Sequence, residues 1–404
     1  MPGGTTRRAA LIAAASLAAL GAAHAQPSPP PPADSPVRIG LLLGLTGALA
    51  QASEDIAYGF ALALDEVDRK AGGRALHVAV ADTFGRSSRT AAQFLRLVQE
   101  EKVDIVVGPT SSPEALVVRD AAHEAGIPVI VPNAGVSALA GEKCSPFVVR
   151  VSYANDQIAG PLGTWMMRSG RAKSAYLLAA DNPSGRDHVA AFRRSFIAAG
   201  GEVTGEELVP PTTRDLSPYL GKLKLVRTEA IFASFFGDAA QLFLDGAEQF
   251  GLRTLKICGP GWLVSTLDLA KVGSRAAGII GATAYLADLD IASNRAFVDA
   301  FTQRHTRPPT EFAAQGYDAG RLLIATLDAL EGNVANRRAV AALLARTPFI
   351  GARGRLAIDP RTNNVIQDIH VFETRKRPGG EGIEFAPLAR IPDVSASADQ
   401  CQMG

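Results

Sequence analysis

Short apolar runs alternate with amphipathic segments along most of the chain, a pattern typical of strands that are each followed by a helix. Val37–Leu43 is a continuous apolar run and predicts a buried strand. Residues 54–70 place apolar side chains at helical spacing and run into two glycines, which predicts a helix. The same reasoning predicts helices over Ser88–Glu100 and Pro113–Ala125 and strands over Leu76–Ala81, Ile105–Val107 and Pro128–Val131.

The alternation starts again after the apolar run Val148–Val151, so the second half of the chain is predicted to repeat the organisation of the first. Strands are predicted at Ala175–Ala179, Val203–Leu208, Ala230–Phe235, Leu255–Cys258, Ile279–Tyr285, Leu356–Ile358 and Ile369–Thr374. Helices are predicted at Gln157–Arg168, Val189–Ala199, Ala239–Phe250, Asn294–His305, Ala313–Glu331 and Ala339–Arg346. Repeated strand–helix–strand units form parallel sheets with right-handed crossovers, so the predicted fold class is α/β.

Two such series predict two Rossmann-like lobes, each a parallel sheet with flanking helices. Three strands that cross between the lobes would form a hinge, because the lobes could then rotate without unfolding. The crossings are predicted near Ser152–Asp156, Tyr285–Asp288 and Gly354–Asn364. The expected bounds are 37–154 with 287–356 for lobe 1, 155–286 with 357–390 for lobe 2, and 391–404 for a C-terminal tail.

Loops rich in small residues follow the apolar runs, three in each half. They are Gly44–Ala48, Gly108–Ser112, Pro132–Ser137, Asp181–Gly185, Phe235–Asp238 and Gly259–Trp262. Ligands of open parallel sheets bind at the carboxyl ends of the strands, where these loops would lie. Two sheets facing each other would therefore line a cleft from both sides, which favours a two-lobed binding protein over an enzyme.

In the first half, Ser111 and Ser112 precede a predicted helix. Ser112 suits the N-cap, Pro113 the first helical position and Glu114 the first turn. The free N–H groups of such a helix start can bind an anion, such as a ligand carboxylate. The alternative is a plain cap that faces water. The next loop, Asn133, Ala134 and Gly135, offers backbone N–H groups without bulk, or is a simple turn.

In the second half, the candidate ligand contacts are Ser184, Phe236, Asp238 and Trp262. Phe236 and Trp262 can stack on an apolar or aromatic ligand, although large aromatic side chains are often part of a core. Asp238 is alternatively a cap for the following helix. Tyr153 and Tyr285 are assigned to the hinge, Tyr317 to packing between the lobes, and His188, beside Asp187, to a solvated helix face.

The N-terminal residues bear on the cellular location that is expected for this protein. Residues 1–25 have two arginines, an apolar stretch and the Ala23–Ala25 cleavage motif, which predict an export signal, with an ordinary N-terminal helix as the alternative. Residues 26–36 form a proline-rich linker. The net charge of +1 gives no indication of nucleic-acid binding. A Cys144–Cys401 disulfide is compatible with the sequence but is not decided by it, and Cys258 is predicted to fill a core.

Motifs for common enzymes are missing from the sequence. It contains no G-x-S-x-G nucleophile elbow, no P-loop, no G-x-G-x-x-G and no H-E-x-x-H. The histidines are scattered without ligand spacing, so neither a metal nor a cofactor is expected.

Several segments together resemble a known family. They are Ile39–Gly47, Asp65–Gly73, Val106–Ser112, Ile127–Pro132, Gln249–Leu252 and Gly316–Ala319. In order and spacing the chain resembles the type I periplasmic binding proteins, in the Leu/Ile/Val-binding branch of ABC-transporter substrate-binding proteins. The resemblance implies a bilobal periplasmic receptor that delivers a small solute to an ABC permease in the inner membrane. It implies no chemistry on the solute, and a monomer suits this role.

Three positions depart from the amino-acid binders that the chain resembles. Gly261 stands where those proteins usually have an acidic residue for the ligand ammonium, Ala52 where they often have an aromatic, and Ser184 where they have a tyrosine. The stretch Asp181–Asp187 and the loop Phe235–Asp238 instead resemble family members that carry aromatic or other carboxylated solutes. The predicted solute is therefore an aromatic or other carboxylated molecule, with an amino acid as the alternative. A periplasmic ligand sensor and a secreted hydrolase are the alternative functions.

Overall fold

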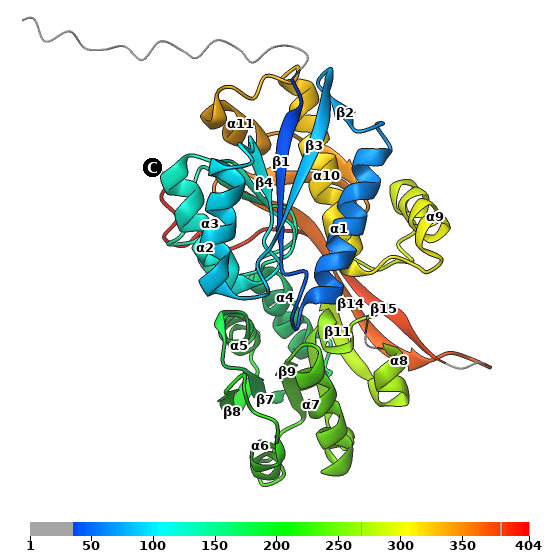
Figure 1. Ribbon diagram of the computed structural model, residues 1–404. Helices are drawn as coiled ribbons and strands as arrows, with labels where there is room; N and C mark the ends of the chain where they lie inside the picture. Colours follow the sequence, from blue (N-terminus) through cyan, green and yellow to red (C-terminus); the bar gives the residue numbers. More distant parts are fainter. Residues whose placement is uncertain (1–34, 268, 380–381, 404) are drawn as a thin grey trace, which may run out of the picture.

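The computed structural model describes residues 35–267, 269–379 and 382–403, which form two stacked α/β lobes (Figure 1). The predicted export signal and the linker as far as residue 34 lie outside the described residues. A single path of hydrogen-bonded strands runs through both lobes in the order β2-β3-β1-β4-β5-β6-β14-β11-β10-β9-β7-β8. The predicted α/β architecture of two Rossmann-like lobes is confirmed.

The first lobe contains a sheet in which β1, β3, β4, β5 and β6 are all parallel. One face packs on α2 and α3, and the other face packs on α1, α9, α10 and α11. The strands are β1 (Val37–Leu43), β2 (Lys70–Ala71), β3 (Arg74–Asp82), β4 (Ile105–Val107), β5 (Val129–Val131), β6 (Val148–Arg150), β12 (Phe349–Gly351) and β13 (Gly354–Asp359). The helices are α1 (Ala50–Asp65), α2 (Ser87–Gln99), α3 (Ser112–Ala125), η1 (Ser137–Ala140), α9 (Ala292–His305), α10 (Glu311–Ala329) and α11 (Arg337–Leu344).

The second lobe repeats the plan with β7, β8, β9, β10 and β11 parallel to one another. Helices α4 and α5 cover one face, and α6, α7 and α8 cover the other. Its strands are β7 (Ser174–Ala180), β8 (Glu202–Val209), β9 (Ala230–Ser234), β10 (Lys256–Pro260) and β11 (Ile279–Thr283). Its helices are α4 (Asn155–Arg168), α5 (Pro183–Ala198), α6 (Ser217–Leu223), α7 (Asp238–Gln249), η2 (Leu252–Thr254), η3 (Gly261–Val264), α8 (Leu269–Val272) and η4 (Gly273–Ala276).

Strand β14 (Asn364–Lys376) belongs to both sheets. Asn364 pairs in parallel with β6 of the first lobe, and residues 370–373 pair antiparallel with β11 of the second. The third crossing therefore lies within β14 and not at Gly354–Asn364 as predicted, because Gly354–Asp359 forms β13 and pairs back onto the start of β14. The other two crossings lie in the β6–α4 and β11–α9 connections. The predicted lobe bounds stay a prediction.

Strand β15 (Ile383–Val394) was not predicted and pairs antiparallel with β14 along most of its length. Beyond it, Cys401 forms a disulfide with Cys144, with a Cα–Cα distance of 5.5 Å. This bond ties the C-terminal segment to the first lobe and settles the pairing that the sequence left open. Cys258 is buried in β10, as predicted.

Helices α1 and α10 approach each other closely through glycines. A Cβ atom on Gly59 would lie 1.9 Å from the carbonyl oxygen of Ala313, and one on Gly316 would lie 2.0 Å from that of Ile56. Larger side chains at either position would push the helices apart. This contact fixes the start of α10, which lies at the boundary between the lobes.

Candidate functional site

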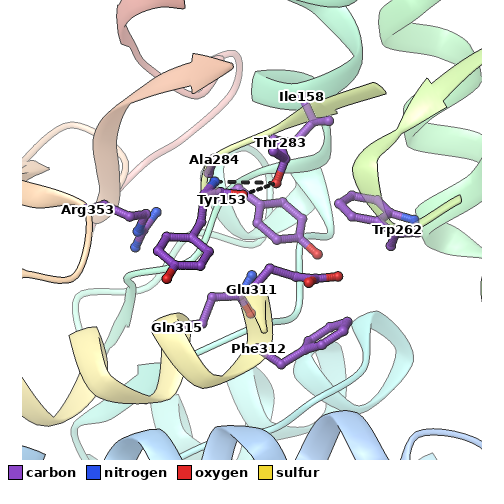
Figure 2. Close-up of a pocket in the computed structure, with 10 residues that line it drawn as sticks. Tyr153, Ile158, Trp262, Thr283, Ala284, Glu311, Phe312, Gln315 and Arg353 are labelled. Atoms are coloured by element: carbon purple, nitrogen blue, oxygen red, sulfur yellow. Dashed lines mark hydrogen bonds between the residues drawn. The ribbon is translucent and has the colours of Figure 1, made fainter. Parts of the chain in front are cut away.

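Residues from both lobes and from the hinge meet at the carboxyl ends of the strands, where ligands of open parallel sheets bind. A small cavity there is lined by Tyr153, Ile158, Trp262, Thr283, Ala284, Tyr285, Glu311, Phe312, Gln315 and Arg353. Figure 2 shows Glu311, Phe312 and Gln315 coming from the first turns of α10, on the side of the cavity opposite Ile158 and Thr283. The first lobe, the second lobe and the crossings all contribute to this place.

Aromatic rings form much of the wall. Tyr153 and Trp262 are stacked with their ring centroids 5.2 Å apart, and His188 lies against Trp262 at 5.1 Å. Phe236 of the second lobe meets Phe312 of the first lobe edge-on at 5.9 Å. Trp262 and Phe236, both predicted ligand contacts, are therefore brought to the boundary between the lobes. Tyr153 lies in the first crossing, as predicted, and lines the cavity as well.

Two carboxylates join the lobes by hydrogen bonds. Glu311 at the start of α10 accepts bonds from the hydroxyls of Ser265 and Thr266, each at 3.0 Å. Asp187 on α5 accepts a bond of 2.7 Å from the backbone N–H of Ser137 and one of 3.0 Å from the amide of Asn155. Burial raises the pKa of Glu311 and that of Asp187, despite these donors. The two lobes are therefore joined by side-chain hydrogen bonds at two separate places.

The start of α3 differs from the prediction in one respect. Ser111, not Ser112, is the N-cap residue, and Ser112 begins the helix. The reason is the buried carboxylate of Glu114, which accepts bonds from the backbone N–H of Ser111, at 3.1 Å, and from its hydroxyl. Ser111 is thereby engaged in a capping box. Ser112 is buried at the same helix start.

The loop after β5 packs against the first crossing. The amide of Asn133 donates to the carbonyl of Thr110 at 2.6 Å, which joins it to the loop before α3. The carbonyl of Gly135 accepts a bond of 2.7 Å from the N–H of Asn155. A Cβ atom on Gly135 would lie 2.2 Å from Oδ1 of Asn155, so only glycine allows this approach. Ala134 between them is buried.

On the second lobe, Ser184 and His188 occupy successive turns of α5. The hydroxyl of Ser184 lies 3.5 Å from Nδ1 of His188 and 3.5 Å from Oδ1 of Asn155. His188 is fully buried, and its Nδ1 is 3.0 Å from the hydroxyl of Ser234 at the end of β9. The prediction of a solvated His188 is wrong, because the helix face that carries it packs on the sheet. Burial lowers the pKa of His188 to about 3.

Asp238 is separate from this group. It is exposed in the first turn of α7, whose N-cap is Gly237, so the prediction that Asp238 caps this helix is wrong, and its role as a ligand contact stays a prediction. Among the described residues it makes no hydrogen bond or ion pair with the other predicted contacts. Its charge still suits the positive end of the helix. Tyr317, predicted to pack between the lobes, instead packs on Phe297 in the first-lobe core and donates to Glu66.

Some buried polar side chains at or next to the site have an atom without a hydrogen-bond partner in the described part of the chain: Tyr285 and Gln315 line the cavity, and His188 packs against Trp262 of its wall. The unpartnered atoms there include Oδ1 of Asn133, Nε2 of His188, the hydroxyl of Tyr285 and Oε1 of Gln315. Each of these side chains is at most 8% exposed. Because buried polar groups in folded proteins almost always have partners, the unpartnered atoms of the cavity residues Tyr285 and Gln315 indicate a place for a polar ligand.

Several of these residues were not found in the sequence. The predicted helix began at Ala313, whereas α10 begins at Glu311 with Thr310 as its cap, so its first turn was missed. The Pro308–Pro309 pair followed by a threonine is a helix-start signal that could have moved the boundary. Gln315 and Arg353 approach the site only through tertiary packing.

A larger cavity of about 610 Å³ lies beside the site and shares Thr283, Tyr285 and Glu311 with it. Its other walls include Leu267, Leu286, Val298, Pro309, Phe372 and Phe385. In the ranges that the structure describes, no cluster of three or more potential metal ligands occurs. Within the same ranges, none of the helices has both the length and the apolar character needed to cross a membrane.

Comparisons with known proteins agree with this geometry. A family model described as "Periplasmic binding protein" matches residues 36–380. The chain is 26% identical over 350 residues to "Leu/Ile/Val-binding protein homolog 6" of Brucella suis, which covers 85% of this chain and 89% of that protein.

Two solved structures are similar in both fold and sequence. One is a solute-binding protein of an ABC transporter from R. palustris in complex with benzoate, with 31% identity, a TM-score of 0.84, and coverage of 91% of this chain and 100% of that one. The other is a solute-binding protein from Rhodopseudomonas palustris BisB5 in complex with 3,4-dihydroxybenzoic acid, with 27% identity, a TM-score of 0.82, and coverage of 89% and 98%.

Proposed function

The chain belongs to the periplasmic binding protein family, and from that premise we propose that it captures a small aromatic carboxylate between its lobes and delivers it to an ABC permease. Its relatives are solute-binding proteins of ABC transporters, which are not enzymes. The chain is accordingly a solute-binding protein, and its family implies a periplasmic location. The solute, the permease and the monomeric state are the proposed parts.

The observation that carries the proposal is a cavity with an aromatic wall in which the hydroxyl of Tyr285 and Oε1 of Gln315 are buried without a hydrogen-bond partner among the described residues. Such a site offers apolar surface for a ring and hydrogen bonds for polar substituents. Tyr153 and Trp262 supply the aromatic surface, and a planar ring can stack on it or meet it edge-on. A small aromatic acid has the matching combination of groups.

The position of Gly261 also favours an acid without an ammonium group. Amino-acid binders that the chain resembles usually have an acidic residue at this position, whose carboxylate pairs with the ligand ammonium. Glycine has no side chain that could form this pair. Nearby Glu311 is already bonded to Ser265 and Thr266. Two similar proteins were solved with benzoate and with 3,4-dihydroxybenzoic acid, which supports the same ligand class.

The ligand carboxylate is proposed to lie at the start of α3 and the loop after β5. Ser112, at the start of α3, and the backbone N–H groups of Ala134 and Gly135 would receive it, in a field that favours negative charge. The ring would then contact Trp262 on the second lobe. A ligand held by both lobes stabilises the closed arrangement, because the open arrangement lacks half of its contacts.

Isothermal titration calorimetry tests the proposal directly. The purified chain should bind benzoate with a dissociation constant near the micromolar range, which corresponds to about 8 kcal/mol. Leucine should bind at least tenfold more weakly. Binding of leucine but of no aromatic acid would overturn the ligand class and leave the family assignment intact.

Ser112→Ala tests where the carboxylate lies. The substitution should weaken the binding of benzoate about tenfold and leave the affinity for the uncharged analogue benzamide nearly unchanged. The reason is that a charge-assisted hydrogen bond is lost only for the acid. Ser274→Ala, in a different part of the second lobe, is the matched control. Equal losses for benzoate and benzamide would argue against an anion site at α3.

A further inference from the structure

His188 stands apart from the other unpartnered residues of the site because no part of its side chain reaches solvent. Its Nδ1 lies 3.0 Å from the hydroxyl of Ser234, and its ring packs against Trp262. Nε2 has no partner among the described residues. One nitrogen is therefore hydrogen-bonded within the protein, while the other, on a ring that packs against Trp262, has no partner among those residues.

The charge state of His188 limits what Nε2 can bind. Burial lowers its pKa to about 3, so the ring is neutral at physiological pH. A neutral imidazole has one N–H, and the serine hydroxyl can either donate to Nδ1 or accept from it. Nε2 is then a donor in the first case and an acceptor in the second.

A hydroxyl group satisfies Nε2 in both cases, because it can donate and accept. A carboxylate can only accept and an ammonium can only donate, so each would fit one tautomer alone. An unsubstituted ring edge fits neither and would leave a buried nitrogen unpaired, which costs binding free energy. The environment of His188 thus favours a solute that has a hydroxyl at this end.

We propose that Nε2 of His188 binds a hydroxyl on the ring of the solute, so that the preferred ligands are hydroxylated aromatic acids. This inference rests on the proposed function, in which the carboxylate lies on the first lobe and the ring against Trp262. His188 and Ser234 then act as a specificity pair on the second lobe. Ser234 orients the imidazole, and His188 contacts the ligand.

Calorimetry with benzoate, 3-hydroxybenzoate, 4-hydroxybenzoate and 3,4-dihydroxybenzoate tests this assignment. At least one hydroxylated acid should bind the unmodified chain about tenfold more tightly than benzoate, the size expected of one net hydrogen bond. In His188→Phe that margin should disappear, while benzoate binding is retained or improved. Ser234→Ala removes the shorter of the two serine contacts of Nδ1 and leaves that of Ser184 at 3.5 Å, so it should reduce the margin without removing it.

A second variant distinguishes loss of the hydrogen bond from misfolding of the protein. His188→Gln keeps a donor and an acceptor and should restore part of the hydroxyl preference that His188→Phe loses. His77→Phe, at an exposed position on β3, is the matched control and should change nothing. Thermal melting confirms that each variant is folded before it is titrated.

The outcomes separate the two proposals. If no aromatic acid binds the unmodified chain, the proposed function fails. If benzoate binds and the hydroxylated acids bind no more tightly, the ligand class stands and the role of His188 is overturned. An unchanged hydroxyl preference in folded His188→Phe would likewise overturn it.

Discussion

Arg353 and Asp318 form a buried ion pair beside the hinge, with Nε of Arg353 2.7 Å from Oδ2 of Asp318 and side chains 3% and 0% exposed. The same guanidinium donates to the carbonyl of Ser152 in the first crossing, at 3.0 Å, and to the side chain of Gln367 in the third. It also lines the cavity next to Tyr285 of the second crossing. One side chain therefore donates hydrogen bonds to two of the three connections between the lobes and lines a cavity together with the third.

Removing Arg353 should destabilise the protein strongly. Burial raises the pKa of Asp318 in spite of the arginine, so the carboxylate depends on this partner to remain charged. Arg353→Met should lower the free energy of unfolding by about 3–5 kcal/mol, measured by urea denaturation, because an unpaired buried carboxylate remains. Arg295→Ala, which breaks an exposed pair with Asp290, should cost less than about 1 kcal/mol. Similar losses in both variants would contradict the role assigned to Arg353.

Trp262 should matter for aromatic ligands in particular. Trp262→Ala should weaken the binding of benzoate about tenfold, because ring stacking contributes on the order of 1 kcal/mol of binding free energy beyond the apolar contact. Cyclohexanecarboxylate has the same carboxylate but no aromatic ring, so its affinity should fall by a smaller factor. Calorimetry of both acids on both proteins measures the difference. If the two acids lose equally, Trp262 contributes only apolar burial.

Alanine substitutions at a glycine between α1 and α10 and at a glycine elsewhere in a helix should have opposite effects on stability. Gly316→Ala should destabilise the fold by about 1–3 kcal/mol, since its Cβ would lie 2.0 Å from the carbonyl oxygen of Ile56. Gly160 lies in α4, where an added Cβ atom would meet no other part of the protein within 4 Å, so Gly160→Ala should stabilise by up to about 1 kcal/mol. Chemical denaturation of the two variants should give opposite signs. A neutral Gly316→Ala would mean that the helices can separate without cost.

The disulfide should support stability without touching the ligand. It joins cysteines that are 257 residues apart, so breaking it frees a long loop in the unfolded chain. Cys144→Ser with Cys401→Ser should lower the free energy of unfolding by about 2–5 kcal/mol. Benzoate affinity of the folded variant should stay within about twofold. The matched control is Cys258→Ala, which leaves the disulfide in place and whose ligand affinity should not change.

The sequence predicted the fold well because periodicity reports directly on burial. The strand Val37–Leu43 was predicted with its observed bounds, since its side chains are buried on both faces apart from Arg38. Strand β15 was missed, because prolines at 387 and 392 interrupt it and most of its side chains are partly or wholly exposed. A strand that is held mainly by hydrogen bonds to its neighbour and is little buried shows no clear alternation of apolar and polar residues in the sequence.

The site was predicted less completely for a related reason. Loops at strand ends can be recognised locally, so Trp262 and Ser184 could be proposed from the sequence, and the structure places both at the boundary between the lobes. Glu311 begins α10 and Arg353 lies in the turn between β12 and β13, both more than a hundred residues away from Ser184, and no local pattern encodes their approach. His188 looked solvated because it follows an aspartate, whereas its exposure depends on which face of α5 meets β9.

The pH dependence of stability should report on His188 without any ligand. Its pKa is about 3 in the folded protein, against 6.5 as the ordinary value, so below pH 6.5 the unfolded chain binds one more proton than the folded chain. Stability from this group is fully present above pH 6.5 and falls as the pH drops toward 3. At pH 5 the loss should be about 2 kcal/mol relative to pH 8.

His188→Gln isolates this contribution, because glutamine cannot take up a proton in the same range. Urea denaturation at pH 5 and pH 8 should show a change in unfolding free energy that is about 2 kcal/mol smaller in the variant than in the unmodified chain. Buried carboxyls with raised pKa values, such as Asp187, act in the opposite direction and are common to both proteins. Their effects cancel in the comparison. Identical pH profiles would mean that His188 can be protonated in the folded state, and the neutral imidazole on which the hydroxyl assignment depends would be lost.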